Sequence, residues 1–153
     1  MLGKLARWLR VLGYDTVYEK IVPDEQLIAR ALRHNRWVLT RDGCLARRNI
    51  LHGRHTLITS DHLDGQLRQL RDELHLSLEP STQRPYRCVR CNALLVRISQ
   101  EAARPLVPPF VAAQYRNFTR CPDCGAVYWP GTHWDTLINR LDRINDGGES
   151  GRR

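Results

Sequence analysis

The sequence predicts an α/β domain built on a parallel sheet, followed by a small segment that cysteines organise. In the first half, short apolar segments alternate with amphipathic helical patterns, which is typical of a parallel sheet covered by helices. In the second half, four of the five cysteines form two C-x-x-C pairs. The length of 153 residues accommodates one domain, or a core domain with a small appendage.

The chain opens in a predicted helix. Leu2, Leu5, Leu9 and Leu12 recur at steps of three and four, so they share one face, and Gly13 follows as a stop signal. The next five residues, YDTVY (14–18), are aromatic and β-branched and predict a strand. Because an α/β unit of this kind normally begins with a strand, we expect the first strand to be missing from the chain as written.

The following elements alternate in type. Pro23-Asp24 introduces a helix whose apolar residues share one face, and a later helix carries a second leucine stripe. Two buried strands are predicted at 37–40 (WVLT) and 55–59 (HTLIT), with a short helix over 43–49 between them. The residues of the two helical stripes are Leu27, Ile28, Ala31 and Leu32, then Leu63, Leu67, Leu70 and Leu74.

The predicted linker is EPSTQRP (79–85), which is rich in proline and polar residues. It divides the chain into residues 1–79, the α/β domain, and residues 80–153, the cysteine segment. The second part is expected to close with a helix over 132–144 and a frayed tail over 147–153.

The cationic excess favours a polyanionic partner. Lysine and arginine number 24 against 16 acids, giving a formal charge of +8 and a pI near 9.8. Lys4 and Lys20 are the lysines and every other cation is arginine, whose planar donor fork suits phosphate. Nucleic acid is the expected partner, and a basic surface that serves solubility is the alternative.

No apolar run approaches membrane-spanning length, and Lys4, Arg7 and Arg10 interrupt the apolar pattern that a secretory signal would need. A cytoplasmic protein without a membrane partner is therefore expected.

The two cysteine pairs, Cys88/Cys91 and Cys121/Cys124, predict a tetrahedral zinc site with four thiolate ligands. Disulfides are not expected in a cytoplasmic chain, and a thioredoxin-type redox pair would open a helix after a strand. A site closed by four thiolates leaves no open coordination position, so the zinc should be structural. Cys44 has no sequence partner and is expected to be a small buried apolar residue.

Two features of the cysteine segment allow both a functional and a structural interpretation. Trp129 and Trp134 either stack bases or form the small core of the segment, and we prefer the core. Its arginines either bind nucleic acid or are simply solvated; they are Arg87, Arg90, Arg97, Arg116 and Arg120.

Three aspartates lie at or just before predicted helix starts. Each of Asp24, Asp42 and Asp61, taken singly, fits a helix N-cap. Together they are candidates for one site, because strand-to-helix turns of a parallel sheet meet at its carboxyl edge. Clustered carboxylates select Mg²⁺ or Mn²⁺, and such an ion facing an anionic substrate indicates phosphodiester hydrolysis. Glu25 and Asp64 are nearby alternates with a helix-dipole role as the simpler explanation.

Several segments together resemble one family. They are MLGKLARWLRVLGYDT, PDEQL, LTRDGCLARR, a Ser-Asp followed by GQL, CVRCNALL and VPP…CPDCGAVYWPGTHW. This pattern resembles the Mut-seven C-terminal RNase family, PIN-like nuclease domains fused to a zinc ribbon, and Thr40-Arg41-Asp42 resembles the Ser/Thr-x-Asp of PIN-type nucleases.

The resemblance implies a PIN-like parallel sheet and a metal-dependent ribonuclease in which Asp24, Asp42 and Asp61 match the acidic positions. It also implies a further aspartate on a strand just ahead of the MLG motif. Either an upstream start would supply this strand, which we prefer, or this version of the domain lacks its first strand and one metal ligand.

The sequence thus predicts a hydrolase that cleaves RNA with Mg²⁺ or Mn²⁺, while structural Zn²⁺ holds the ribbon. Arg7, Arg10 and Arg41 are the candidate RNA-backbone contacts, and the alternative for Arg7 and Arg10 is that they form the exposed polar face of the first helix. The alternatives are a non-catalytic RNA-binding zinc-ribbon protein that lacks part of the nuclease site, and a protein-docking platform.

Overall fold

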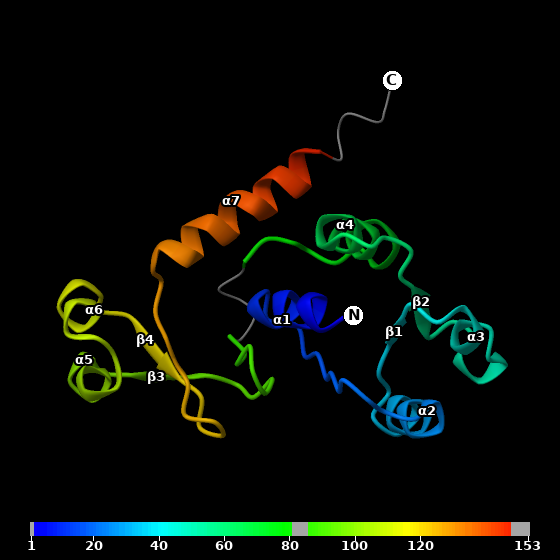
Figure 1. The fold of residues 1–153 in the computed structure, drawn as a ribbon, viewed down its shortest axis with the longest axis horizontal. Helices are drawn as coiled ribbons and strands as arrows, with labels where there is room; N and C mark the ends of the chain where they lie inside the picture. The colour runs from blue at the N-terminus through cyan, green and yellow to red at the C-terminus, as the bar shows by residue number, and fades with distance from the viewer. Residues whose placement is uncertain (1, 81–85, 148–153) are drawn as a thin grey trace. The chain divides into compact units, whose positions relative to one another are not determined.

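The computed structural model describes residues 2–80 and 86–147, which form two compact units (Figure 1). One unit contains the described residues up to Leu5 together with Tyr18–His75. The other contains Ala6–Val17 and the described chain from Leu76 onward. Helix α1 (Gly3–Val11) therefore begins in the first unit and continues in the second. The predicted boundary at residue 79 would place the whole of α1 in the α/β domain, whereas Ala6–Val17 belongs to the second unit.

The first unit is a small mixed α/β structure. Strands β1 (Val38–Thr40) and β2 (His55–Leu57) pair in parallel, with Val38 opposite His55 and Thr40 opposite Leu57. The parallel pairing confirms the predicted class. The helical elements are α2 (Asp24–Arg33), α3 (Gly43–Ala46), the 3₁₀ turn η1 (Asn49–Leu51) and α4 (Leu63–Leu74).

The core of this unit forms on the predicted apolar faces. Ile28 and Ala31 of α2 are buried with Val38, Leu45 and Leu51. The leucine stripe of α4 is buried as well, at Leu63, Leu67 and Leu70. Each such leucine or isoleucine contributes about 1.5–3 kcal/mol on full burial, which fixes the short strands between the helices.

The strand predicted over 14–18 is wrong, because this segment forms no strand. Its polar backbone groups are bound by side chains instead: the Thr16 amide donates to Asn92 Oδ1 at 3.0 Å, and the Thr16 carbonyl accepts from Arg10 Nε at 2.8 Å. The sheet of the first unit consequently has two strands where three were expected.

Helix α1 ends as its sequence predicts. Gly13 adopts a φ of +89°, and the amides of Gly13 and Tyr14 bond back to the carbonyls of Arg10 and Leu9 at 2.9 Å each. This is the paired bonding of a Schellman cap, which requires the left-handed conformation that glycine adopts without strain.

The second unit has a three-stranded antiparallel sheet in the order β3–β4–β5. Its strands are β3 (Val96–Ile98), β4 (Phe118–Arg120) and β5 (Val127–Tyr128). Between β3 and β4 the chain forms α5 (Gln100–Ala103), η2 (Arg104–Leu106) and α6 (Pro109–Gln114), and Figure 1 shows α5 and α6 beyond one end of these strands. Ala103, Val111 and Phe118 form the small core that joins these helices to the sheet.

Helix α7 (Thr132–Asp146) closes the described chain and confirms the predicted C-terminal helix. Residues 81–85 of the predicted linker and 148–153 of the predicted tail lie outside the described residues. Across the described chain, every helix is too short or too polar to cross a membrane.

Candidate functional site

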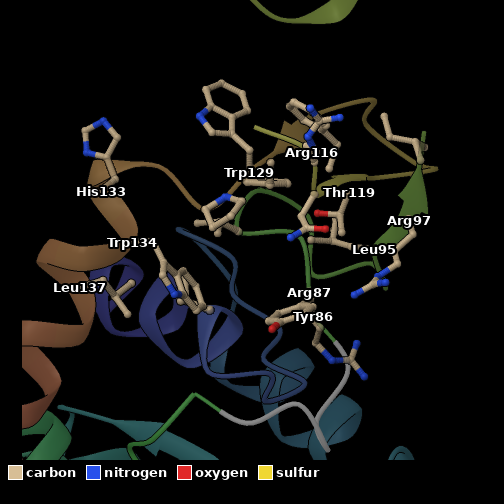
Figure 2. Close-up of a pocket in the computed structure, with 17 residues that line it drawn as sticks. Tyr86, Arg87, Leu95, Arg97, Arg116, Thr119, Trp129, His133, Trp134 and Leu137 are labelled. Atoms are coloured by element: carbon tan, nitrogen blue, oxygen red, sulfur yellow. The ribbon is translucent and has the colours of Figure 1, made fainter. Parts of the chain in front are cut away.

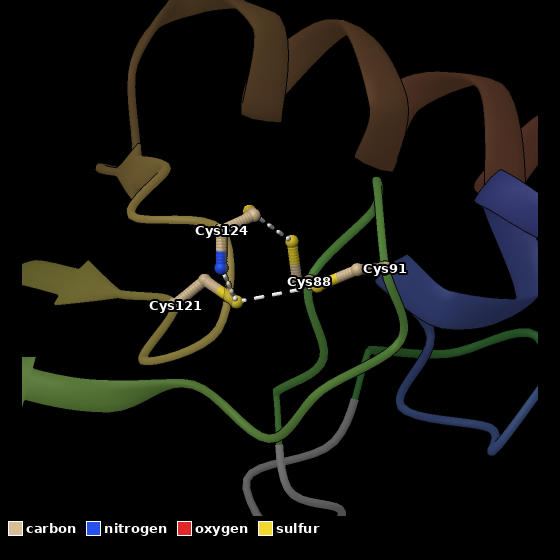
Figure 3. A group of neighbouring side chains, drawn as sticks. All are labelled: Cys88, Cys91, Cys121 and Cys124. Atoms are coloured by element: carbon tan, nitrogen blue, oxygen red, sulfur yellow. Dashed lines mark hydrogen bonds between the residues drawn. The ribbon is translucent and has the colours of Figure 1, made fainter.

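The four paired cysteines come together at one point of the second unit (Figure 3). Their Sγ atoms all lie within 4.8 Å of one another, with 3.5 Å between Cys88 and Cys124 and 3.3 Å between Cys91 and Cys121. Tetrahedral zinc with Zn–S bonds of about 2.3 Å requires sulfur separations of roughly 3.8 Å, so this donor set fits zinc. Among residues 2–80 and 86–147 this is the one group of three or more potential metal ligands.

The two C-x-x-C turns have the same backbone geometry. The amides of Cys88 and Cys121 donate to the carbonyl five residues later at 2.8 and 2.9 Å, and their carbonyls accept from the amide four residues later at 2.9 and 3.0 Å. Each turn needs a left-handed residue directly after its second cysteine. Asn92 fills this position with a φ of +70°, and Gly125 fills it with a φ of +78°. Asparagine and glycine are the residues that adopt this conformation most readily.

The thiol environment favours a cation. Burial opposes ionisation of Cys88, but the Tyr128 hydroxyl, 3.2 Å from its Sγ, and nearby backbone N–H groups outweigh burial and lower its pKa to about 6. For Cys91 the Ala93 N–H favours the thiolate, yet the contacts with the other three thiols and burial together outweigh it and raise the pKa to about 12. Clustered thiols therefore do not all ionise on their own, and a bound divalent ion would supply the missing positive charge.

Arg10 lies buried at the base of the first turn, with an exposed fraction of 7%. Its Nη1 donates to the carbonyls of Val89 at 2.8 Å and Arg90 at 3.2 Å, and burial lowers its pKa. Arg10 is one of the predicted RNA contacts, and in this structure its guanidinium donates to backbone carbonyls. Arg7, on the same helix, is exposed.

Asn92 is a structural residue that the sequence analysis missed. Its Oδ1 accepts from the Thr16 amide, and its Nδ2 donates to Asp15 Oδ1 at 2.7 Å. Comparison of C-x-x-C-N-A with C-x-x-C-G-A in the two turns marks the position, because both residues favour positive φ. Tyr128, whose hydroxyl contacts Cys88, could not be predicted from the spacing of residues in the sequence.

The three candidate aspartates, Asp24, Asp42 and Asp61, lie in the first unit. Asp42 caps α3: its Oδ1 accepts from the amides of Cys44 at 2.7 Å and Leu45 at 3.2 Å. No hydrogen bond to its Oδ2 exists within the described chain. Asp24 is exposed in the first turn of α2 and has no ion-pair partner among the described residues.

Asp61 is also exposed and pairs with Arg41. The hydrogen bond from the Arg41 guanidinium, followed by its charge, lowers the pKa of the Asp61 carboxyl. Since β1 and β2 run in parallel, Asp42 and Asp61 follow strand ends at the same edge, and the Arg41 contact joins the two loops. The alternate Glu25 is paired with Arg48 at 2.8 Å.

The three aspartates do not form a ligand group in this structure. Within the described residues, the four cysteines lie close enough together to hold one metal ion, and Asp24, Asp42 and Asp61 do not. Their donor chemistry fits a hard divalent ion, because they offer ionised oxygens and two of them are without competing side-chain cations. Asp42 and Asp61 therefore lie at the same edge of the parallel sheet, but the three aspartates do not form a cation site within the described residues.

Cys44 departs from its predicted burial. It is exposed, and Arg47 Nη2 lies 3.5 Å from its Sγ. The short helix α3 places its apolar neighbour Leu45 in the core and directs Cys44 outward.

A family model described as Mut7-C RNAse domain matches residues 1–141 of the chain. Comparisons with curated proteins and with solved structures gave no match. The matched range contains the three aspartates and all four zinc-type cysteines.

Proposed function

The chain belongs to the Mut7-C RNAse domain family, and we propose that it is a ribonuclease that hydrolyses RNA phosphodiester bonds with a divalent metal ion. The family match carries this proposal, because it spans nearly the whole chain and the family is named for RNase activity. The formal charge of +8 supports a polyanionic substrate.

The proposed catalytic residues are Asp24, Asp42 and Asp61. Asp42 keeps Oδ2 available while Oδ1 caps α3, so the helix start holds the carboxylate in a fixed direction. Asp61 would hold the cation in place of its Arg41 partner, and the Arg41 guanidinium would then lie beside the ion as a candidate contact for an RNA phosphate. A bound Mg²⁺ or Mn²⁺ would supply an activated water and stabilise the leaving oxygen.

The zinc site has a structural role in this proposal. Its four thiolates leave no position for water or substrate, and the residues around it hold α1 and the β3–β5 sheet. Arg7 is exposed and is a candidate contact for the RNA backbone, whereas the Arg10 guanidinium is buried against backbone carbonyls.

The substitution Asp42→Asn tests the proposal. Asparagine caps a helix about as well as aspartate, so α3 should persist while the ionised ligand is lost. We expect cleavage of single-stranded RNA in Mn²⁺ to fall about 100-fold or more, which is a loss of about 3 kcal/mol, with RNA binding retained.

The matched control is Asp142→Asn, which removes the same charge from an exposed position of α7. It should cleave like the unsubstituted chain. Cleavage that persists in Asp42→Asn, or that needs no divalent ion, would contradict the proposal, and binding without any cleavage would identify a non-catalytic RNA binder.

A further inference from the structure

The second unit contains a cavity of about 560 Å³ between its sheet and the start of α7 (Figure 2). Figure 2 shows His133, Trp134 and Leu137 of α7 on one side and Arg97 and Thr119 of the strands on the other. Pockets that hold small ligands typically measure about 300–1,000 Å³, so this cavity has room for a nucleotide-sized group. None of the three proposed catalytic aspartates lines it.

The cavity presents flat aromatic surfaces. Tyr86 and Trp134 meet edge to face, with ring centroids 6.4 Å apart and an interplanar angle of 76°. Tyr86 is 43% exposed and Trp134 is half-buried, so this pair is packed without being enclosed. Trp129 lines the cavity too and packs on Phe118 at 6.4 Å. Exposed aromatic faces are what unpaired nucleobases stack on.

The charged residues of the cavity are all cationic. Arg87, Arg97 and Arg116 line it, and no aspartate or glutamate does. Arg97 and Arg116 are exposed and make no ion pair or hydrogen bond within the part of the chain that the structure describes. Arg87 is held by Asn92 and Asp15. Two unpaired guanidinium groups beside aromatic faces complement the phosphates and bases of nucleic acid.

The cavity wall is fixed by the sheet and the cysteine cluster. Arg97, Thr119 and Tyr128 are direct cross-strand partners, so they form one row across β3, β4 and β5, and all three line the cavity. Tyr128 ends this row with its hydroxyl 3.2 Å from Cys88 Sγ. The ligand surface is therefore attached to the metal centre, which limits the entropy lost on binding.

The backbone of Gly131 approaches the Trp129 indole closely and so helps to position it. A Cβ on Gly131 would lie 3.1 Å from Trp129 Nε1, and the Gly131 amide donates to the Trp129 carbonyl at 2.9 Å. Glycine at the start of α7 thus allows the indole to pack against the turn.

We propose that this cavity binds an unpaired base of single-stranded RNA, with the base stacked on the Tyr86–Trp134 pair and the flanking phosphates bound by Arg97 and Arg116. The inference rests on the proposed function, because it takes RNA as the substrate. It adds a substrate-holding site on the zinc ribbon, in a different unit from the catalytic acids, and a preference for unpaired RNA, since bases in a duplex expose no free face.

The test measures binding in the absence of Mg²⁺ and Mn²⁺, so that it does not depend on cleavage. The zinc-loaded full chain is titrated into a fluorescent single-stranded oligoadenylate at several salt concentrations. The double variant Arg97→Gln/Arg116→Gln should bind about ten-fold or more weakly, with a salt slope lower by about 1.4, because each phosphate contact on a single strand contributes about 0.7. Arg104→Gln, an exposed arginine of η2 outside the cavity lining, is the matched control and should change neither value.

The aromatic part is tested separately. Trp134→Ala should weaken binding roughly 5- to 150-fold, the range of base stacking on aromatic side chains, without lowering the salt slope. Should this variant fold poorly, Tyr86→Leu probes the same pair from an exposed position. A duplex of the same length should bind at least about ten-fold more weakly than the single strand.

The inference is overturned if the double arginine variant binds RNA as well as Arg104→Gln does. This holds even if the cavity surface proves to bind a protein instead. The inference is also overturned if duplex and single strand bind equally well. Absence of cleavage by a chain that shows the expected binding losses would count against the proposed function alone, so the two failures are distinguishable.

Discussion

Arg10 binds the segment after helix α1 and the first cysteine turn through three charge-assisted hydrogen bonds. Its Nε donates to the Thr16 carbonyl, and its Nη1 donates to the carbonyls of Val89 and Arg90. A buried guanidinium is stable only while its donors are satisfied, and a buried carbonyl is likewise costly without a donor. The residue therefore stabilises the turn that presents Cys88 and Cys91.

Replacing Arg10 by methionine should destabilise the protein by about 2–3 kcal/mol, because methionine keeps the apolar stem and leaves these carbonyls without their donor. Chemical denaturation monitored by circular dichroism measures the change. Arg7→Met is the control, because Arg7 is exposed on the same helix, and it should change the free energy of unfolding by no more than about 0.5 kcal/mol. Equal stabilities of the two variants would contradict this role for Arg10.

The same residue shows what a local pattern can predict. Spacing of three and four correctly predicts that Leu5, Leu9 and Leu12 are buried. It assigns Arg7 and Arg10 alike to the polar face, because the carbonyls that bind Arg10 lie 79 and 80 residues later in the sequence. No window of one helix contains that information.

At the scale of elements, the two cysteine turns are equivalent in backbone and different in side chain. Gly125 supplies the left-handed residue and nothing more, whereas Asn92 supplies it and also binds Asp15 and the Thr16 amide. The first turn is thereby attached to the segment that follows α1, and the second turn is not attached in this way.

Substitutions at Asn92 separate these two contributions. Asn92→Gly keeps the positive φ and loses the side-chain bonds, so it should cost about 1–2 kcal/mol. Asn92→Ala loses the same bonds and adds the strain of an ordinary residue in the left-handed region, about 1 kcal/mol more. Thermal unfolding of both variants measures the difference. A glycine variant no more stable than the alanine variant would contradict the backbone argument.

The segment 14–18 shows why element prediction fails locally. Aromatic and β-branched residues predict a strand, but a strand forms only where a partner strand completes its hydrogen bonds. Here Asn92 and Arg10 satisfy the polar groups of Thr16 instead. Strands 38–40 and 55–57 have each other as partners, and the sequence predicts both. The cysteine cluster is predictable for a different reason: the C-x-x-C spacing itself specifies the turn that directs two sulfurs to one point.

For the molecule as a whole, segments that are neighbours in the sequence do not always belong to the same compact unit. Ala6–Val17 packs with the chain from Leu76 onward, although about sixty residues of the other unit intervene. The charge is also redistributed: four thiolates and one Zn²⁺ would lower the formal charge of +8 by two, and they would do so beside the cavity that Tyr128 joins to the cluster.

Zinc removal should therefore act on the cysteine turns and on the cavity together. Zinc binding supplies about 10–16 kcal/mol to zinc-finger peptides, and without it the four thiols lack the charge that holds them together. We expect a chelator to abolish hydrogen-exchange protection at the amides of Cys88 and Cys121 and to weaken binding of single-stranded RNA, since Tyr128 loses its anchored partner. The Ile58 amide, which donates to the Thr40 carbonyl in the parallel sheet, is the internal reference and should keep its protection. Cysteine-turn amides that stay protected after zinc has left would show that the protein forms these turns without the metal, and the role assigned to the ion would then be wrong.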